Sequence, residues 1–362
     1  MTTHNTHLLD LYTDYLLVSF GAATATGLAR LLPEISHDQV TRFLSQQELS
    51  DKDLWKIVKP HLRRIQSPEA VLIIDDTVEE KPYTDESELI CWHFDHTKNR
   101  TIKGINLLSA LYFSQDTSLP VAFELVKKTE LVTDKKTGKD KWQSPRTKNE
   151  YARDMIASVV HKQIPFRYVL TDVWFSSSEN MVFIKHKVRK DFILPLKSNR
   201  KVALSLEHKK RGQWTTLSSL CLDTDTPVTL YLESVPFALI VSRQVFTNED
   251  GSESILYLCS SDVSLSAASL QAIYQKRWKV EEYHKSLKQN ACFARSPTKL
   301  PLTQSNHFFA SVVAFVKLEV YRASTRLNHF ALRGKLYQAA LSSAFQRLQE
   351  FKAACPAATT IV

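Results

Sequence analysis

The stretch "AVLIIDDT", residues 70 to 77, sets the fold class of this chain. Its apolar run follows Pro68 and predicts a buried strand. The strand ends on two aspartates, Asp75 and Asp76. Because removing a carboxylate from water without a partner is costly, acids at the end of a buried strand are poorly placed for packing alone. We therefore expect the acids at this edge of the sheet to have a catalytic or metal-binding role.

The segments that follow this strand predict a mixed α/β sheet. They are strands at 102–114 and 119–126 with a turn at 115–118, a long basic loop at 127–148, a helix at 148–164, a strand at 167–172, a helix at 177–188 and a strand at 191–197. Such an order is typical of a mixed sheet rather than a doubly wound one. Residues 199–262 break the alternation and contain a hairpin turn signal at 248–251, so we interpret them as a β-rich insertion.

Helical regions are predicted on both sides of this core. The N-terminal region contains two capping boxes, Ser36 with Gln39 and Ser50 with Asp53, and finishes on the basic "HLRR". It could be a helix-turn-helix-like DNA reader or a small helical cap on the next domain. The full division is 1–66, N-terminal helical and a candidate DNA-binding region; 67–198, first part of the core; 199–262, insertion; 263–298, core helix; and 299–362, C-terminal helical region.

The composition points to a polyanionic partner. Lys and Arg number 47 against 38 Asp and Glu, a net charge of +9, which suits nucleic acid or an anionic membrane surface. The five cysteines form no C-x-x-C pair, which indicates a reduced chain without a zinc knuckle. The start of the chain lacks a signal-peptide pattern, and the longest apolar stretch, 16–32, is interrupted by glycines and an arginine. We expect a cytoplasmic protein with no membrane span.

Three acidic positions stand out by their context. They are Asp75-Asp76, Asp172 at the end of "YVLTD", and Glu281 or Glu282 on a late helix. Two strand-end acids and one helix acid could hold Mg²⁺ ions that clamp the attacking and leaving oxygens of a phosphodiester. For any single acid the alternative is that it caps a helix or turn, and Asp172 before "SSSEN" could do so. For all three together we favour the metal.

The late helix, "YQKRWKVEEYHKSLKQ" at 274–289, separates its two glutamates. At roughly 100° per residue, one stripe roughly 60° wide carries Tyr274, Arg277, Glu281 and Lys288. The neighbouring sector, which is predicted to face the core, carries Ile273, Val280, Tyr283 and Leu287. Glu282 points away from the stripe. A salt bridge between Arg277 and Glu281 would be worth a few tenths of a kcal/mol but leaves the rest of the stripe unexplained, so we favour Glu281.

These residues resemble a known family. The spacing Tyr274-x2-Arg277-x3-Glu281-x6-Lys288 is similar to the Y-R-E-K signature of the bacterial insertion-sequence transposases of the "IS four" group, which have a DDE active site. "IIDDT" resembles the family's first-aspartate block, in which the acid is followed directly by Thr, and this favours Asp76. "LTDVWF" resembles the second block and points to Asp172. Because strand alternation puts Asp75 on the other face, the pattern leaves it open as an alternative to Asp76.

The resemblance implies an RNase H-like catalytic core with a β-rich insertion. It implies two Mg²⁺ ions per site, with Mn²⁺ as a substitute, held by Asp76, Asp172 and Glu281. The enzyme would excise and integrate an insertion sequence, by cut-and-paste with a DNA hairpin intermediate. The partners would be double-stranded DNA, as terminal inverted repeats and target, and a second copy of the chain, in the bacterial nucleoid. Backbone phosphates would be held by Tyr274, Arg277 and Lys288, and we assign Lys285 to the same role.

Other aromatic and basic residues have weaker assignments. The family stacks an insertion aromatic on a flipped base, and Trp214, Phe237, Phe246 and Tyr257 are all candidates here. Trp174 and Trp278 are expected to be core residues rather than base stackers. Cys91, His93 and His96 fit no zinc spacing, so core packing or DNA contact is favoured. Lys98, Arg100, Lys103 and the basic loop from Lys135 to Lys148 are expected to contact the DNA backbone, although a solvated surface is nearly as good for the loop.

Two other functions compete with transposition. One is a DNA-binding protein derived from such an enzyme, which would lack a catalytic acid, and none is missing. The other is a nuclease of the same fold that cuts without joining.

Overall fold

The structure is a computed structural model that describes residues 3–95, 99–133 and 138–354. The chain divides into two compact units. The larger is Ser50–His284, and the smaller combines Met1–Leu49 with Lys285–Val362. The five-part division expected from the sequence stays a prediction.

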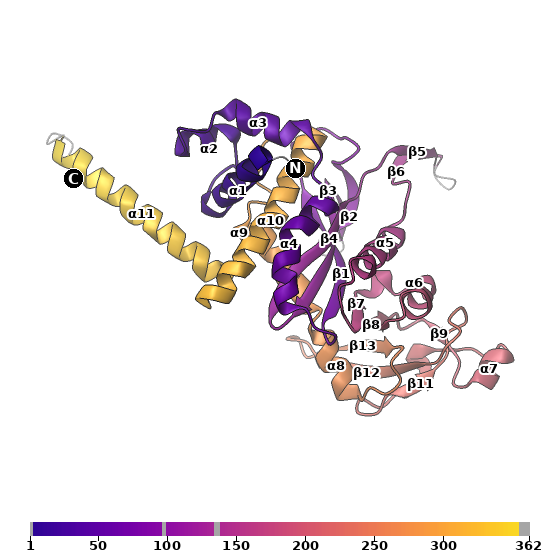
Figure 1. Cartoon of the computed structure of the whole chain (residues 1–362). Helices are drawn as coiled ribbons and strands as arrows, with labels where there is room; N and C mark the ends of the chain where they lie inside the picture. Colours follow the sequence, from indigo (N-terminus) through magenta and orange to yellow (C-terminus); the bar gives the residue numbers. More distant parts are fainter. Residues whose placement is uncertain (1–2, 96–98, 134–137, 355–362) are drawn as a thin grey trace. The chain divides into compact units, whose positions relative to one another are not determined.

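The larger unit is built on one central sheet (Figure 1). The sheet has the order β11-β12-β13-β8-β7-β1-β3-β2, with β4 also paired to β3. Its strands are β1 (Val71–Glu80), β2 (Cys91–Asp95), β3 (Arg100–Ser114), β4 (Thr117–Leu125), β7 (Tyr168–Thr171), β8 (Asp191–Leu196), β11 (Val228–Leu230), β12 (Leu239–Thr247) and β13 (Glu253–Ser260). β1, β3 and β4 are antiparallel, whereas β7 and β8 run parallel to β1. This mixed sheet confirms the expected α/β core of the RNase H-like kind.

The insertion extends this same sheet. β12 and β13 form the predicted hairpin, closed by the turn from Asn248 to Ser252, and β13 pairs antiparallel with β8. The other elements of the insertion are short: β9 (Lys201–Val202), α7 (Leu206–Lys210), β10 (Thr215–Thr216), η3 (Leu217–Ser219) and β11, which pairs with β12. The β-rich prediction is confirmed.

Helices connect and cover the strands of the larger unit. They are α4 (Asp51–Ile65), α5 (Lys148–His161), η1 (Val173–Phe175), α6 (Ser178–Val182), η2 (Phe183–Lys187), α8 (Ala267–Gln275) and the first half of α9 (Trp278–Asn290). α4 packs on β4, and α5 packs on β3 and β4. Both predicted capping boxes are present, one at the start of α3 (His37–Gln46) and the other at the start of α4.

The predicted basic loop at 127–148 is wrong in part. It contains the strands β5 (Glu130–Thr133) and β6 (Asp140–Gln143), which pair antiparallel and are exposed. Leu131 lies opposite Trp142 in this pairing, and such an aromatic–aliphatic pair stabilises a hairpin. The many charged residues of the segment favoured a loop in the sequence analysis, and this apolar pair was not recognised. Lys135 lies outside the described residues.

The single helix predicted at 274–289 is also wrong. α8 ends at Gln275 and α9 begins at Trp278. Between them the N–H groups of Lys276 and Arg277 bond the carbonyls three residues earlier, a tighter turn than the α-helix has. A constant angle per residue therefore does not hold across the junction. Within α9, Val280, Tyr283 and Leu287 are buried as expected.

The smaller unit is helical, with α10 at its centre. Its helices are α1 (Thr3–Val18), α2 (Ala25–Leu31), α3 (His37–Gln46), the end of α9, α10 (Pro301–Thr325) and α11 (His329–Ala354). α1 and α3 both pack on α10. The buried Asn306 amide bonds the Leu44 and Gln47 carbonyls and the Leu49 N–H, which ties α10 to the end of α3. Among the described residues, no helix has the length and apolar content that a membrane crossing requires.

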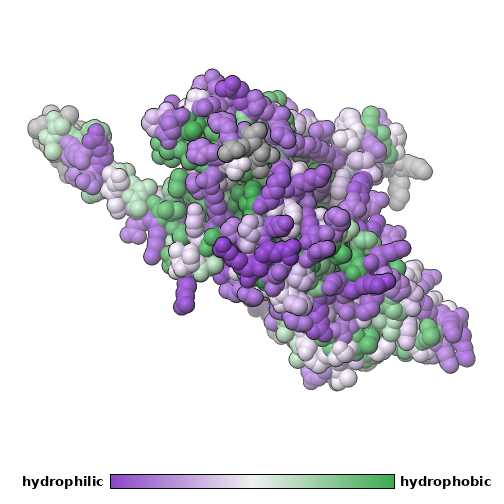
Figure 2. All heavy atoms as spheres, viewed as in Figure 1, coloured by the Kyte–Doolittle hydropathy of each residue, from purple (hydrophilic) through white to green (hydrophobic). Residues whose placement is uncertain are grey.

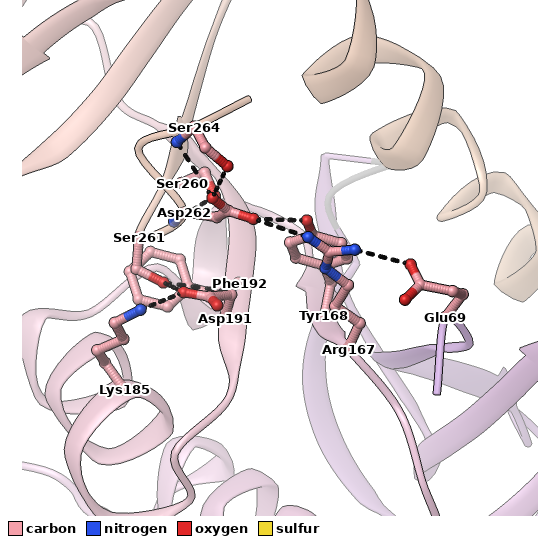
Figure 3. Close-up of polar contacts among 10 residues, drawn as sticks. All are labelled: Glu69, Arg167, Tyr168, Lys185, Asp191, Phe192, Ser260, Ser261, Asp262 and Ser264. Atoms are coloured by element: carbon pink, nitrogen blue, oxygen red, sulfur yellow. Dashed lines mark hydrogen bonds and ion pairs between the residues drawn. The ribbon is translucent and has the colours of Figure 1, made fainter. Parts of the chain in front are cut away.

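A polar network holds the starts of β7 and β8 against the end of β13 (Figure 3). The Asp262 carboxylate accepts hydrogen bonds from Tyr168 Oη at 2.8 Å and from Ser264 Oγ at 2.6 Å. Arg167 joins Asp262 to Glu69, with contacts of 3.4 and 2.9 Å. Burial raises the pKa of Asp262, but these hydrogen bonds together lower it by more, so the pKa lies below its usual value.

We predict that Asp262→Asn lowers the free energy of unfolding by about 1–2 kcal/mol, because it weakens several charge-assisted hydrogen bonds. A carboxyl with a lowered pKa stabilises the fold above the unfolded pKa, about 4, and loses this contribution as the pH falls through the folded value. The variant should therefore lose less stability than the wild type below about pH 4. Urea unfolding across pH measures this. Glu249→Gln, an exposed acid in the β12–β13 turn, is the control. Equal acid sensitivity in the wild type and Asp262→Asn would contradict the assignment.

Candidate active site

Two aspartates lie side by side because β1 and β7 are parallel neighbours. The register pairs Ile74 with Thr171. The residue that follows each of them is an acid: Asp75 after Ile74, and Asp172 after Thr171. Across β1 on the other side, Asp75 pairs with Ser109 of β3. Asp172 follows the carboxyl end of β7, as expected, but β1 continues past Asp75 to Glu80 in its pairing with β3. The two carboxylates therefore lie where β7 ends beside β1, and the expectation that β1 ends on its aspartates was wrong.

Asp75 and Asp76 have different surroundings, as strand alternation requires. Asp75 is buried and faces Arg277, whose Nη1 lies 3.4 Å from its Oδ2. Asp76 accepts hydrogen bonds from Asn106 Nδ2 at 2.5 Å and from Lys148 Nζ at 2.7 Å. Lys148 begins α5, which packs on β3 and β4. The structure thus pairs Asp76 with an amide and an ammonium, and Asp75 with the junction of α8 and α9.

α9 supplies a glutamate and a histidine to the Asp75 side. The Arg277 Nη1 lies 3.4 Å from Glu281 Oε1, the same distance that separates it from Asp75. One ligand atom each from Asp75, Glu281 and His284 lie within 4.8 Å of one another. His284 was missed by sequence reasoning, although its position three residues after Glu281 on a helix places both on one face.

α9 is held against the sheet by the residue before His284. Tyr283 is fully buried, and its Oη lies 3.4 Å from Ser109 Oγ. Since Ser109 is the β3 partner of Asp75, this contact sets the helix directly over the strand position that carries the acid.

The carboxylates of the site repel one another. Burial raises the pKa of Asp75 well above its usual range, and the charges of Asp172, Asp76 and Glu281 raise it further, while Arg277 opposes them. Burial also raises the pKa of Asp172, with a contribution from Asp76. Concentrated negative charge of this kind is a feature of sites that bind cations.

Asp172 caps a short helix as well as lying at the site. Its Oδ1 accepts the N–H of Trp174 at 2.9 Å, at the start of η1. The capping alternative is therefore present in the structure. It does not exclude a metal, because a carboxylate has two oxygens and can accept several contacts.

Tyr274 and Arg277 pack together beside these acids. The Arg277 guanidinium lies 5.9 Å from the Tyr274 ring centroid, and Tyr274 Oη donates to the Thr171 carbonyl at 3.2 Å. Burial raises the pKa of Tyr274, which stays a neutral donor. Burial lowers the pKa of Arg277, but Tyr274, Asp75 and Glu281 raise it by more, so the guanidinium stays charged. Lys285 and Lys288 belong to the smaller unit, and their role stays a prediction.

Two tryptophans expected in the core are exposed. Trp174 has 54% and Trp278 has 62% of its surface exposed, so both predictions were wrong. Trp174 follows the end of β7 on the short η1, and Trp278 begins α9 two residues before the buried Val280. Both lie beside a site residue where a regular element starts, and an aromatic residue there need not face the core.

The remaining expectations have mixed outcomes. Cys91 Sγ lies 3.2 Å from His93 Nε2, and both residues are buried. Burial raises the pKa of Cys91 to about 11 and lowers that of His93 to about 3, so both are neutral and core packing is supported. Of the insertion aromatics, Phe246 is 44% and Tyr257 is 4% exposed. Arg100 pairs with Glu80, and Lys103 lies over the Trp92 ring. His96 and Lys98 lie outside the described residues.

The comparison with protein families agrees with this geometry. A model described as DDE superfamily endonuclease matches residues 1–226, which include Asp75, Asp76 and Asp172. No curated protein matches the chain.

The donor set fits a divalent metal ion. Carboxylate oxygens suit Mg²⁺ and Mn²⁺, and an imidazole is a further ligand for transition metals. Asp75 and Glu281 offer carboxylate oxygens and His284 offers an imidazole nitrogen, all within 4.8 Å of one another, and Asp172 lies beside Asp75 in the strand register.

We predict that excess Mn²⁺ raises the Tm of the wild type by about 3–5 °C, the effect of metal at about ten times its Kd. Asp75→Asn should raise the metal-free Tm, because it removes a buried repelled charge, and should abolish the metal-induced increase. A carboxyl with a raised pKa destabilises the fold as the pH rises from about 4 through its folded pKa. That loss of stability should be absent from Asp75→Asn.

Asp76→Asn is the matched variant for this experiment. It should lower the metal-free Tm, because Lys148 loses its charged partner, and should keep the metal-induced increase. The opposite pattern, with the metal response lost in Asp76→Asn and kept in Asp75→Asn, would place the metal on the other face of β1. Differential scanning calorimetry with and without metal distinguishes the two.

Proposed function

The chain belongs to the DDE superfamily endonuclease family, and from this we propose that it is a DNA transposase that excises and integrates an insertion sequence. Membership in the family supports a transposase or nuclease acting on DNA. The observation that carries the proposal further is that Asp75 and Glu281 both lie 3.4 Å from Arg277, with Asp172 beside Asp75 in the strand register. We assign the chain to the "IS four" group on its Y-R-E-K spacing, of which Tyr274, Arg277 and Glu281 lie together.

Asp75 is the better candidate for the first catalytic acid. It shares a metal-sized cluster with Glu281 and His284, and Arg277 lies 3.4 Å from both carboxylates. Asp76 is instead neutralised by Lys148 and hydrogen-bonded to Asn106. This replaces the assignment of Asp76 that the block resemblance favoured.

The residues of the site have distinct roles in the proposed reaction. Asp75, Asp172 and Glu281, with His284, would hold two Mg²⁺ ions. Bound metal of this kind activates the attacking oxygen and neutralises the leaving one. Arg277 contacts Asp75 and Glu281 at 3.4 Å, which is long for such pairs, so it can turn to a phosphate once the carboxylates have another counter-ion. Tyr274 holds the end of β7 in place through the Thr171 carbonyl.

We predict that Glu281→Gln abolishes Mg²⁺-dependent cleavage of DNA carrying the element's ends, because a metal-binding carboxylate becomes neutral. The loss should be at least about 10³-fold, the scale on which a catalytic group acts. Asp75→Asn should behave in the same way. DNA binding, measured by fluorescence anisotropy, should remain in both.

The controls are the neighbouring acids, Glu282→Gln and Asp76→Asn. Glu282 is 55% exposed and pairs with Lys279 on the surface of α9, so its loss should leave the cleavage rate within a few-fold of the wild type. Undiminished cleavage by Glu281→Gln would refute the site. If the wild type binds DNA and no variant or metal gives cleavage, the DNA-binding derivative becomes the better function.

Joining distinguishes a transposase from a nuclease of the same fold. A pre-cleaved end with a free 3′-OH should be transferred into a second duplex by the wild type, and hairpin ends should accumulate on the flanking side if that route is used. Cleavage without either product would identify a nuclease.

α11 supports a homodimer. After Tyr337, which packs on Phe20, the helix is exposed on all sides. Its large apolar residues nevertheless recur at spacings of three and four, and they are 46–64% exposed: Tyr337, Leu341, Phe345, Leu348 and Phe351. Green, hydrophobic spheres are visible at the surface of α11 in Figure 2. A stripe with this period suits a second helix of the same kind, and two copies would let one assembly hold both ends of an element.

We predict that Leu341→Glu with Leu348→Glu prevents this association, because it puts charges into the seam. Ser342→Glu with Gln346→Glu, on the opposite side of α11, is the matched control. Light scattering after size exclusion, with and without DNA ends, gives the mass. A wild type that stays monomeric in both conditions would contradict the dimer.

A further inference from the structure

An exposed indole lies beside the proposed active site, at the end of β7. Trp174 is two residues from Asp172, and its backbone N–H is bonded to that carboxylate at 2.9 Å. The ring is nevertheless 54% exposed. A tryptophan of this exposure adds little to the core, so its position needs another reason.

The end of the next strand supplies positive charge to the same ring. Lys197 directly follows β8, is exposed, and holds its Nζ 5.3 Å from the Trp174 ring centroid. Arg200 follows three residues later and bonds Ser178 Oγ at 2.6 Å, and Lys201 after it is exposed. The carboxyl ends of β7 and β8 are parallel neighbours, so the indole and these cations share one edge of the sheet.

Proteins that bind unpaired nucleotides commonly use an exposed aromatic ring bordered by positively charged side chains. Bases of any sequence stack on the ring, and the cations follow the backbone. A phosphate held by a metal ion at Asp172 would have its flanking nucleotide within reach of a ring only two residues away. Cleavage at the end of an element also requires the strands to separate there, which exposes bases.

We propose that Trp174 and Lys197 form a binding site for an unpaired nucleotide of the DNA strand next to the scissile phosphate. The base stacks on the exposed part of the indole, and Lys197 contacts the backbone. This site is separate from the aromatics of the insertion, and it rests on the proposed function of the chain as an enzyme that acts on DNA ends.

The test uses a forked oligonucleotide with 2-aminopurine in its unpaired arm and Ca²⁺ in place of Mg²⁺. Stacking on an indole quenches 2-aminopurine, so the wild type should quench it on binding. Trp174→Ala should abolish the quenching and weaken binding of the fork by about tenfold, the order expected for one stacked base. Trp174→Phe keeps a ring and should retain most of the affinity. Lys197→Gln should weaken binding less and reduce its salt dependence.

Tyr83→Ala is the matched control, because Tyr83 is a 96% exposed aromatic residue in the connection between β1 and β2, which carries neither a site residue nor a predicted DNA contact. Its quenching and affinity should equal those of the wild type. Cleavage adds a second readout: Trp174→Ala should be impaired on fully paired ends and recover on ends with a mismatch at the cleavage position, where no unpairing is needed.

The outcomes separate the two proposals. If the wild type cleaves DNA and Trp174→Ala quenches and binds as the wild type does, this inference is overturned and the function stands. If the wild type neither binds nor cleaves DNA, the proposed function falls and the nucleotide site falls with it.

Discussion

The parallel pairing of β1 with β7 is the constraint on which the site depends. One register, Ile74 opposite Thr171, puts Asp75 and Asp172 next to each other where β7 ends beside β1 in the middle of the sheet. A slip of one residue in either strand would turn its acid to the other face. The four residues of β7 are all buried, so their apolar side chains hold that register against a large loss of hydrophobic burial.

β7 is short, and different interactions hold its two ends. At its start, Tyr168 donates to Asp262, and Arg167 connects the same carboxylate to Glu69. At its end, Tyr274 donates to the Thr171 carbonyl, and Asp172 caps η1. The first network serves stability, because its hydrogen bonds lower the pKa of Asp262 and favour the folded state. At the other end, burial and neighbouring charges raise the pKa of Asp172, which the folded state tolerates rather than gains from.

Repulsion between acids at one end of the strands is therefore balanced within the fold. Arg277 is the internal counter-ion, in long contacts with Asp75 and Glu281 rather than a tight pair with either. A tight pair would make the cluster more stable and less ready to exchange a guanidinium for a metal. On the other face of β1, Asp76 forms a close ion pair with Lys148 at 2.7 Å, in contrast to the long contact of Asp75 with Arg277 at 3.4 Å. The contrast between adjacent residues is the physical basis for assigning different roles to them.

The sequence by itself determined the order of β1, β3, β4, α5, β7, α6 and β8, the β-rich insertion and the positions that carry acids, because these depend on local periodicity and on carboxylates that follow apolar runs. It missed β2, β5 and β6, which are short strands. It could not choose between Asp75 and Asp76, since alternation says only that they face opposite ways, and the block resemblance favoured the one that now pairs with Lys148. Contacts between distant segments favour Asp75: the Ser109–Tyr283 contact places α9 over Asp75, and His284 joins the cluster only through this packing. The break between α8 and α9 and the exposure of Trp174 and Trp278 were also tertiary outcomes, because helix continuity and burial depend on what an element packs against. Local pattern thus identified the residues, and packing decided which of them meet.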